Sequence, residues 1–248
     1  METEIFQQLK PGAGKWQMIC FPYLGGYANS YLDLANALDE EFEVWSLNPP
    51  GHGLSTSEPV QHIGTLLDMY YKELQAIIKP HSVFLGHSMG GIIAYFLAQR
   101  LLNSGDYTSN SLQLVLSACN TPCEFKGTNY FNLSNDKLID HLISYDGIPE
   151  ELIHERSLLE YFLPVIRADF RVLETSSILD FKPLDIPVSF LWGENDKVVP
   201  MESVIQWMKY FSNEIKVVPI EGGSHMFISA KAKVVAEHLG DILLRQTV

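Results

Sequence analysis

The sequence has 248 residues, 46% of them hydrophobic, and a formal net charge of -13 from 17 basic and 30 acidic side chains. This length and apolar content fit one large α/β domain and exclude a disordered or fibrous chain. The acidic balance, without any Lys/Arg cluster, argues against nucleic acid and anionic membrane surfaces as partners. The N-terminus lacks a signal-peptide pattern and no apolar run approaches the roughly 20 residues of a membrane span, so we expect a cytoplasmic protein.

Apolar runs and amphipathic patterns alternate in the first half of the chain. Apolar runs predict strands at 17–21, 42–48, 82–87 and 112–118, and helical spacing predicts helices at 27–38, 63–78 and 89–102. Strands rich in aliphatic residues, without polar alternation, are typical of a parallel sheet with both faces buried. The expected fold class is therefore α/β, with a mostly parallel, doubly wound sheet.

A helical block interrupts this alternation from about residue 122 to residue 180. Its helical spacing covers 138–143 and then 158–173, where Pro164 is expected to kink or split the helix. The sheet pattern resumes with strands at 186–193 and 214–220 and helices at about 201–211 and 227–245. We therefore expect one domain, 1–248, with a helical lid inserted over the sheet edge where such folds bind ligands.

The segment GHSMG, residues 86–90, matches the pattern G-x-S-x-G between a predicted strand and a predicted helix. A strand-to-helix turn of this kind holds its serine in a strained conformation above the sheet, and flanking glycines remove clashing side chains. The helix N-terminus also favours developing negative charge. These features predict that Ser88 is the nucleophile of an α/β-hydrolase fold, although a Gly-rich turn with an ordinary N-cap serine is the alternative.

A nucleophilic serine needs a base and an acid that orients the base, in the chain order Ser, acid, His in this fold. Asp196 lies in a polar loop directly after a predicted strand, and His225 lies in the Gly-rich loop after the last predicted strand. Glu194 lies closer to the strand end and Asp185 precedes the strand, so both are weaker candidates for the acid. We predict the triad Ser88, Asp196 and His225.

Two loops at the same sheet edge surround this predicted triad. The oxyanion hole needs two backbone N–H groups, which we assign to Met89 and to Leu24 in the loop FPYLGGY. An ordinary glycine turn is the alternative for that loop. The second loop, NPPGHG at 48–53, is expected to be structural, and His87 is expected to pack beneath the nucleophile.

Patterns for nucleotide or metal binding are missing from the sequence. It contains no G-x-G-x-x-G, no Walker pattern and no H-E-x-x-H, and its His and carboxylate residues do not cluster at metal-ligand spacing. We therefore predict no cofactor and no metal ion.

Several segments together resemble the type II thioesterases of non-ribosomal peptide and polyketide synthesis. The resemblance covers nearly the whole chain and rests on FPYLGG, NPPGHG, GHSMGG, LPVIRADFRVLE (163–174), WGENDKVVP and EGGSHMF. The GHSMGG and His segments are common to many hydrolases, whereas FPYLGG and R-A-D-F are more particular to this family. One departure is Leu24, where the family commonly has alanine.

The resemblance implies a discrete, monomeric editing enzyme without a cofactor. It would hydrolyse short acyl thioesters from the phosphopantetheine arm of an acyl or peptidyl carrier protein. Carrier proteins are typically acidic, as this chain is, so a local basic patch would have to hold one; the candidates are Lys72, Lys79, Arg100, Arg167 and Arg171. The alternatives are a general carboxylesterase or lipase-like enzyme, a chain-releasing thioesterase, and a catalytically silent binding protein of the same fold.

Overall fold

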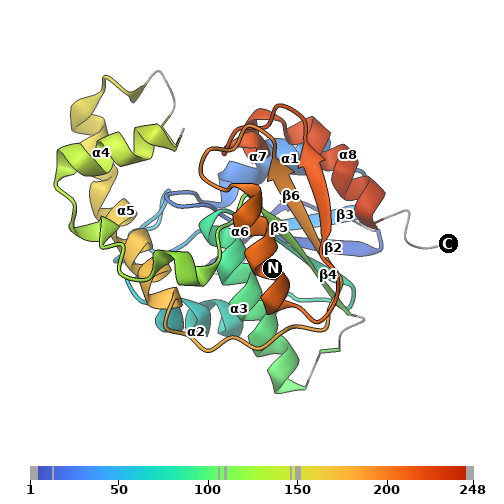
Figure 1. Ribbon diagram of the computed structural model, residues 1–248. Helices are drawn as coiled ribbons and strands as arrows, with labels where there is room; N and C mark the ends of the chain where they lie inside the picture. Colours follow the sequence, from blue (N-terminus) through green and yellow to red (C-terminus); the bar gives the residue numbers. More distant parts are fainter. Residues whose placement is uncertain are drawn as a thin grey trace.

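A seven-stranded sheet forms the centre of the computed structural model, which describes residues 5–12, 14–105, 107–108, 111–145, 147–148 and 152–243 (Figure 1). The strand order is β1-β3-β2-β4-β5-β6-β7. The strands are β1 (Phe6–Lys10), β2 (Trp16–Phe21), β3 (Phe42–Leu47), β4 (Ser82–His87), β5 (Leu112–Ser117), β6 (Val188–Gly193) and β7 (Lys216–Ile220). Strands β2 to β7 pair in parallel, which confirms the expected fold class.

Strand β1 was not expected from the sequence. It pairs with β3 in the antiparallel direction and forms one edge of the sheet. Its sequence, FQQLK, contains three polar residues, because only part of this edge strand is buried. An edge strand that is half exposed lacks the continuous apolar run by which the central strands are recognised.

Helices cover both faces of the sheet. One face packs against α2 (Ile63–Leu74), α3 (Met89–Ser104), α5 (Arg156–Ser176), α6 (Met201–Gln206) and η5 (Trp207–Tyr210). The other packs against η1 (Ala28–Tyr31), α1 (Leu32–Ala37), α7 (Phe227–Ala230) and α8 (Ala232–Leu243). Successive strand residues alternate between the two cores: in β2, Ile19 and Phe21 face the first, and Met18 and Cys20 the second. The helix predicted at about 227–245 is two helices, α7 and α8. Residues 244 and 245 of the predicted range lie outside the described part of the chain.

The regular elements described between β5 and β6 are helices, joined by turns and loops. They include η2 (Pro122–Phe125), η3 (Tyr130–Asn132), α4 (Asn135–Ser144) and the long α5. In Figure 1 α4 and the N-terminal part of α5 form a lobe to one side of the sheet. We call the described residues of the segment 122–180, which contains both helices, the insertion lobe. None of the described helices is long and apolar enough to cross a membrane.

Helix α5 runs through Pro164 as one helix of 21 residues, so the proline does not split the helix. Proline removes the hydrogen bond to the carbonyl four residues earlier, which here belongs to Glu160. Pro164 and Glu160 are both exposed. Water can therefore satisfy that carbonyl, and the apolar face on the other side of α5 remains packed.

Candidate active site

Ser88 lies at the sharp turn between β4 and α3. Its backbone has φ 51° and ψ −121°, a conformation that is costly for a residue with a side chain. The turn needs glycine on both sides: a Cβ at Gly86 would collide with the carbonyl of Gly90, and a Cβ at Gly90 would collide with the carbonyl of Phe21. The local sequence thus produces the strained turn and presents the Ser88 hydroxyl above the sheet edge.

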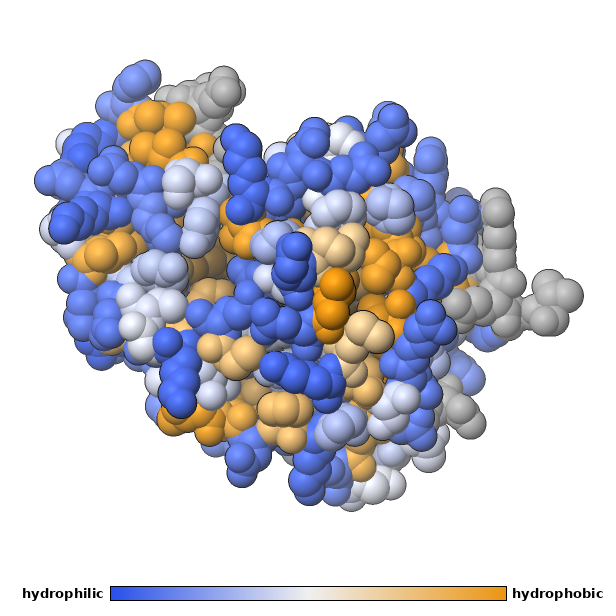
Figure 2. All heavy atoms as spheres, in the orientation of Figure 1, coloured by the Kyte–Doolittle hydropathy of each residue, from blue (hydrophilic) through white to orange (hydrophobic). Residues whose placement is uncertain are grey.

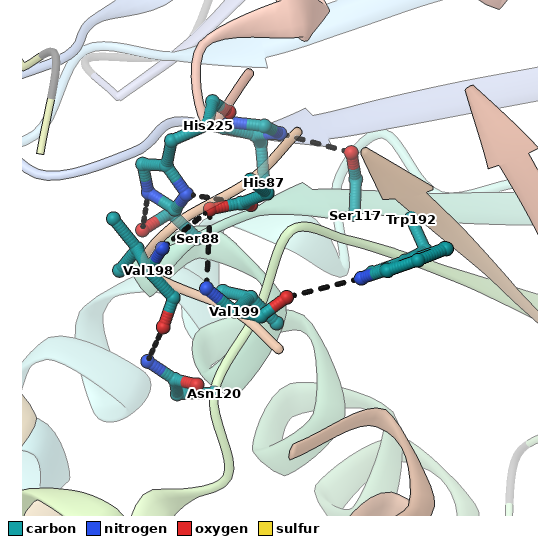
Figure 3. Close-up of polar contacts among 9 residues, drawn as sticks. His87, Ser88, Ser117, Asn120, Trp192, Val198, Val199 and His225 are labelled. Carbon is teal, nitrogen blue, oxygen red and sulfur yellow. Dashed lines mark hydrogen bonds and ion pairs between the residues drawn. The ribbon is translucent and has the colours of Figure 1, made fainter. Parts of the chain in front are cut away.

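The structure brings the side chains of Ser88, His225 and Asp196 into one hydrogen-bonded chain (Figure 3). The Ser88 hydroxyl donates to Nε2 of His225 over 3.1 Å, and Nδ1 of His225 donates to Oδ2 of Asp196 over 3.0 Å. His225 and Asp196 are 6% and 8% exposed, so water screens their interaction weakly. This geometry allows His225 to take the serine proton while Asp196 holds the ring in the required tautomer.

Backbone groups fix the orientation of the Asp196 carboxylate. Its Oδ1 accepts hydrogen bonds from the amides of Val198 and Val199, at 2.8 and 3.1 Å, which leaves Oδ2 directed at His225. The two competing carboxylates make other contacts. Glu194 accepts from the amide of Gly222, and Asp185 accepts from the side chain of Asn213.

His87 is fully buried next to Ser88 in the chain and contacts the backbone of His225, the proposed base. Its Nε2 donates to the carbonyl of His225 over 2.9 Å, and its Nδ1 accepts from the hydroxyl of Ser117 over 2.9 Å (Figure 3). Burial, followed by the proximity of His225, holds the pKa of His87 well below its usual value, so the ring is neutral. A neutral ring is required for Nδ1 to accept, and the two contacts therefore define one tautomer.

The loop after β2, residues 22–27, which we call the oxyanion loop, lies beside Ser88. Leu24 and Gly25 line the same cavity as Ser88. Two amides of this loop are already bound within the protein: Gly25 donates to Oδ2 of Asp169 over 2.7 Å, and Gly26 donates to the carbonyl of Tyr23 over 2.8 Å. This arrangement supports the N–H of Leu24, rather than those of the glycines, as an oxyanion donor. The second predicted donor, Met89, begins α3 directly after Ser88.

Asp169 is a residue that our interpretation of the sequence did not assign to the site. It lies on α5, is 3% exposed, and its Oδ2 also contacts Nε2 of His52 at 2.9 Å. Since Nδ1 of His52 donates to the carbonyl of Pro50, Nε2 donates to Asp169 when the ring is protonated. Burial lowers the pKa of His52, but the charge and hydrogen bond of Asp169, with the backbone carbonyls, outweigh it and raise that pKa above 6.5. Asp169 thus joins α5, the NPPGHG loop and the oxyanion loop.

A second contact joins α5 to the oxyanion loop. Gly25 has φ +75°, and a Cβ there would lie 2.8 Å from Cδ1 of Ile166. Glycine is therefore needed both for the backbone conformation and for the close packing of α5. The R-A-D-F segment was the available signal in the sequence, since it places an acidic residue among apolar ones on a helix.

The five basic side chains that were candidates for carrier binding are mostly occupied within the protein. Lys79 pairs with Glu43 and Arg100 with Asp68. Arg167 donates to the carbonyls of Phe131 and Leu133, both at 2.7 Å, and so joins α5 to η3. Replacing Arg167 would therefore disturb the insertion lobe as well as any docking surface. Arg171 lies over the ring of Phe131, 4.6 Å from its centre.

A cavity of about 970 Å³ opens above Ser88 and His225. Its walls are formed by the oxyanion loop, by the loop of His225 and by α4 and α5 of the insertion lobe. In Figure 2 apolar surface is visible where the lobe meets the rest of the molecule. This cavity is at the upper end of the size range of ligand sites, so it can accept a substrate much larger than a simple ester.

The chain is similar in sequence and in fold to several known proteins. The family model described as thioesterase domain matches residues 16–243. The gramicidin S biosynthesis protein GrsT of Aneurinibacillus migulanus is 29% identical, over 87% of this chain and 84% of that protein. The human medium-chain S-acyl fatty acid synthase thioesterase is 28% identical, over 86% of this chain and 81% of that protein. Among solved structures, the type II thioesterase BorB from the borrelidin biosynthetic cluster has a TM-score of 0.83 and 27% identity, covering 96% of this chain and 97% of that one.

Proposed function

Because this chain belongs to the thioesterase domain family, we propose that it hydrolyses acyl thioesters carried on the phosphopantetheine arm of a carrier protein. The role would be editing in polyketide or non-ribosomal peptide synthesis, with Ser88, His225 and Asp196 as the catalytic triad. The observation that carries the proposal is the hydrogen-bonded chain of these three residues at the wall of a large cavity. The insertion lobe, residues 122–180, would act as the lid.

The proposed reaction has two steps. His225 accepts the proton of Ser88 as the hydroxyl oxygen attacks the thioester carbonyl, and the N–H groups of Leu24 and Met89 stabilise the oxyanion. The carbon–sulfur bond then breaks, and His225 gives its proton to the leaving thiolate. In the second step His225 deprotonates a water molecule, which attacks the acyl-serine ester and releases the free acid together with the Ser88 hydroxyl.

The carrier protein would add binding energy far from the bond that breaks. Such energy can be used to open the lid and place the carbonyl, so it raises the rate as well as the affinity. The test offers one acyl group in three forms: on a phosphopantetheinylated carrier protein, on free pantetheine, and as an oxygen ester. We expect kcat/KM to be at least about tenfold higher on the carrier, which corresponds to about 1.4 kcal/mol. Equal cleavage of all three forms would favour a general carboxylesterase.

The nucleophile is tested on the same protein. Ser88→Ala should abolish labelling by a fluorophosphonate and lower turnover by about 10⁴–10⁶, as in other serine triads. Ser189→Ala is a matched control, because Ser189 is also a buried serine of the sheet, on β6, but is not part of the cavity lining. Labelling of the Ser88→Ala protein would place the nucleophile elsewhere.

A further inference from the structure

We propose that the acyl group which this enzyme removes is an uncharged aliphatic chain of about eight carbons, and that the insertion lobe binds it. This inference rests on the proposed thioesterase function and names its substrate class. It replaces the short acyl group expected from the sequence.

The first observation is that the described part of the cavity wall carries no formal charge. Among the described residues that line it there is no Asp, Glu, Lys or Arg. A carboxylate or ammonium group that loses water without gaining a partner is strongly disfavoured. A malonyl group carries a carboxylate and an aminoacyl group carries an ammonium. Binding either group in this cavity would therefore cost more free energy than binding an uncharged aliphatic chain.

The second observation is that most polar side chains of the lining lie on one side of the cavity. The main body contributes polar and apolar side chains, and its polar ones are Tyr23, Tyr27, Ser30, Ser88, Asn120, His225 and Ser229. The lining residues within α4 and α5 are all apolar, among them Ile139, Leu142, Leu159, Leu163, Ile166 and Phe170, and Tyr145 at the end of α4 is the one polar side chain described on that side. The phosphopantetheine arm contains two amides and a hydroxyl, whereas an acyl chain has no polar group beyond its carbonyl. The arm therefore suits the body wall and the acyl chain suits the lobe.

Asn120 supports this orientation of the substrate. Its Nδ2 donates to the carbonyl of Val198 over 3.3 Å. Its Oδ1 is buried and has no hydrogen-bond partner in the described part of the chain. A buried acceptor without a partner is unfavourable, so a donor from the substrate would stabilise it. An amide N–H of the pantetheine arm is such a donor, and a hydrocarbon chain has none.

The length of the apolar wall sets the length of the acyl chain. Ile166 packs on Gly25 next to the oxyanion loop, and Leu159 lies on the same face of α5 about two turns further away, or about 10 Å. Neighbouring Cα atoms of a polypeptide are about 3.8 Å apart and are joined by three bonds, which gives about 1.3 Å per bond. An extended acyl chain advances by about the same length per carbon–carbon bond. A chain of about eight carbons thus reaches from the oxyanion loop to Leu159.

The test is a series of acyl-pantetheine thioesters from acetyl to dodecanoyl, with malonyl-pantetheine beside it. Each methylene buried against the lobe should raise kcat/KM by up to about fourfold, until a plateau near octanoyl. Malonyl should be cleaved at least about tenfold more slowly than butyryl. A flat series, or preference for acetyl or malonyl, would overturn the proposal. Failure to cleave any thioester in the series would instead contradict the proposed function.

Two neighbouring leucines on α5 provide a variant and its control. Leu159 is 9% exposed and lines the cavity, whereas Leu158 is 41% exposed and is not part of the lining. Leu159→Trp should move the plateau to shorter chains, lowering kcat/KM for octanoyl by about tenfold or more while acetyl is little changed. Leu158→Trp should leave the series unchanged. If Leu159→Trp lowers acetyl and octanoyl equally with an unchanged melting temperature, Leu159 does not bind the acyl chain.

If Leu159→Trp does not fold, Leu159→Ala gives a second measurement of the same contact. It should reduce the gain per methylene near octanoyl and leave acetyl unchanged. An unchanged series for Leu159→Ala would also overturn the proposal.

Discussion

Replacing Asp169 by Asn should affect both the stability of the protein and the position of its oxyanion loop. The Asp169 carboxylate is buried and accepts hydrogen bonds from Gly25 and, in the protonated ring, from His52. Hydrogen bonds to charged groups contribute about 1.5–3 kcal/mol each, and breaking a buried ion pair costs about 3–5 kcal/mol. Because the Asn side chain can still accept one hydrogen bond, we expect Asp169→Asn to lower the free energy of unfolding by about 3 kcal/mol, the lower end of the cost of breaking a buried ion pair. For a domain of this size that corresponds to a melting temperature about 6–12 °C lower.

The catalytic effect comes through Gly25. Without the carboxylate, the loop that carries the N–H of Leu24 is no longer held against α5. A displacement of about 1 Å at a reacting group can lower the rate by about 10²-fold. We therefore expect kcat to fall by about 10–10²-fold with KM changed little, since the cavity walls remain.

The assay is thioester hydrolysis under saturating and limiting substrate, at a temperature well below the melting temperature of the variant. Glu174→Gln is the matched control, because Glu174 also lies on α5 and also accepts a backbone hydrogen bond, from Asn129 at 3.0 Å, but does not touch the oxyanion loop. If Asp169→Asn keeps the kcat of the unmodified protein, or if Glu174→Gln lowers kcat equally, Asp169 does not position the oxyanion loop.

Three other predictions follow from the same contacts. Asp196→Asn should keep the fold but lower kcat by about 10⁴-fold, since His225 loses the acceptor that fixes its tautomer. If Glu194→Gln lowers kcat more than Asp196→Asn in the same assay, Glu194 is the acid. The pKa of His52 is higher in the folded state than its usual 6.5, so the stability from its pair with Asp169 is fully present below that value and is lost as pH rises through the folded pKa. The melting temperatures of the unmodified protein and of Asp169→Asn should accordingly differ less as pH rises, when thermal unfolding is measured from about pH 5.5 to about pH 9. Amide hydrogen exchange should be faster in residues 156–163 of α5 than in 168–176 and in β4, because Tyr161 and Phe162 are exposed whereas Phe170, Val172 and Leu173 are buried; equal protection along α5 would indicate a rigid lobe.

The central sheet could be predicted because its signals are local. Strands β2 to β6 lie within a residue or two of the expected ranges, since fully buried strands appear as continuous apolar runs. The resemblance to type II thioesterases is confirmed as well. Five of its six segments lie at the turns of this sheet, and the sixth, 163–174, lies within α5. Strand β1 and the continuity of α5 were not predictable in this way. Strand β1 is partly polar because it lies at an exposed edge, and α5 tolerates Pro164 because that residue faces water. The local sequence does not indicate either exposure.

The candidate site was predictable to a different degree for each residue. Ser88 stands out through the glycines on both sides of it, and Asp196 and His225 through their places after late strands. The structure brings these three side chains together, and their catalytic roles stay predictions. The pair of His52 and Asp169 was missed because 117 residues separate the two partners. Nothing in the local sequence of either residue indicates the other.

Helix α5 physically joins the two halves of the site. Its C-terminal part holds the oxyanion loop through Asp169 and Ile166, and its N-terminal part lines the lobe side of the cavity through Leu159 and Leu163. Because the helix is continuous through Pro164, a movement of one part can be transmitted to the other. In the proposed complex, an acyl chain packed against the lobe would therefore act on the same element that holds the loop of the proposed oxyanion donor. In this way, binding energy gained far from the thioester carbonyl can contribute to the rate of the chemical step.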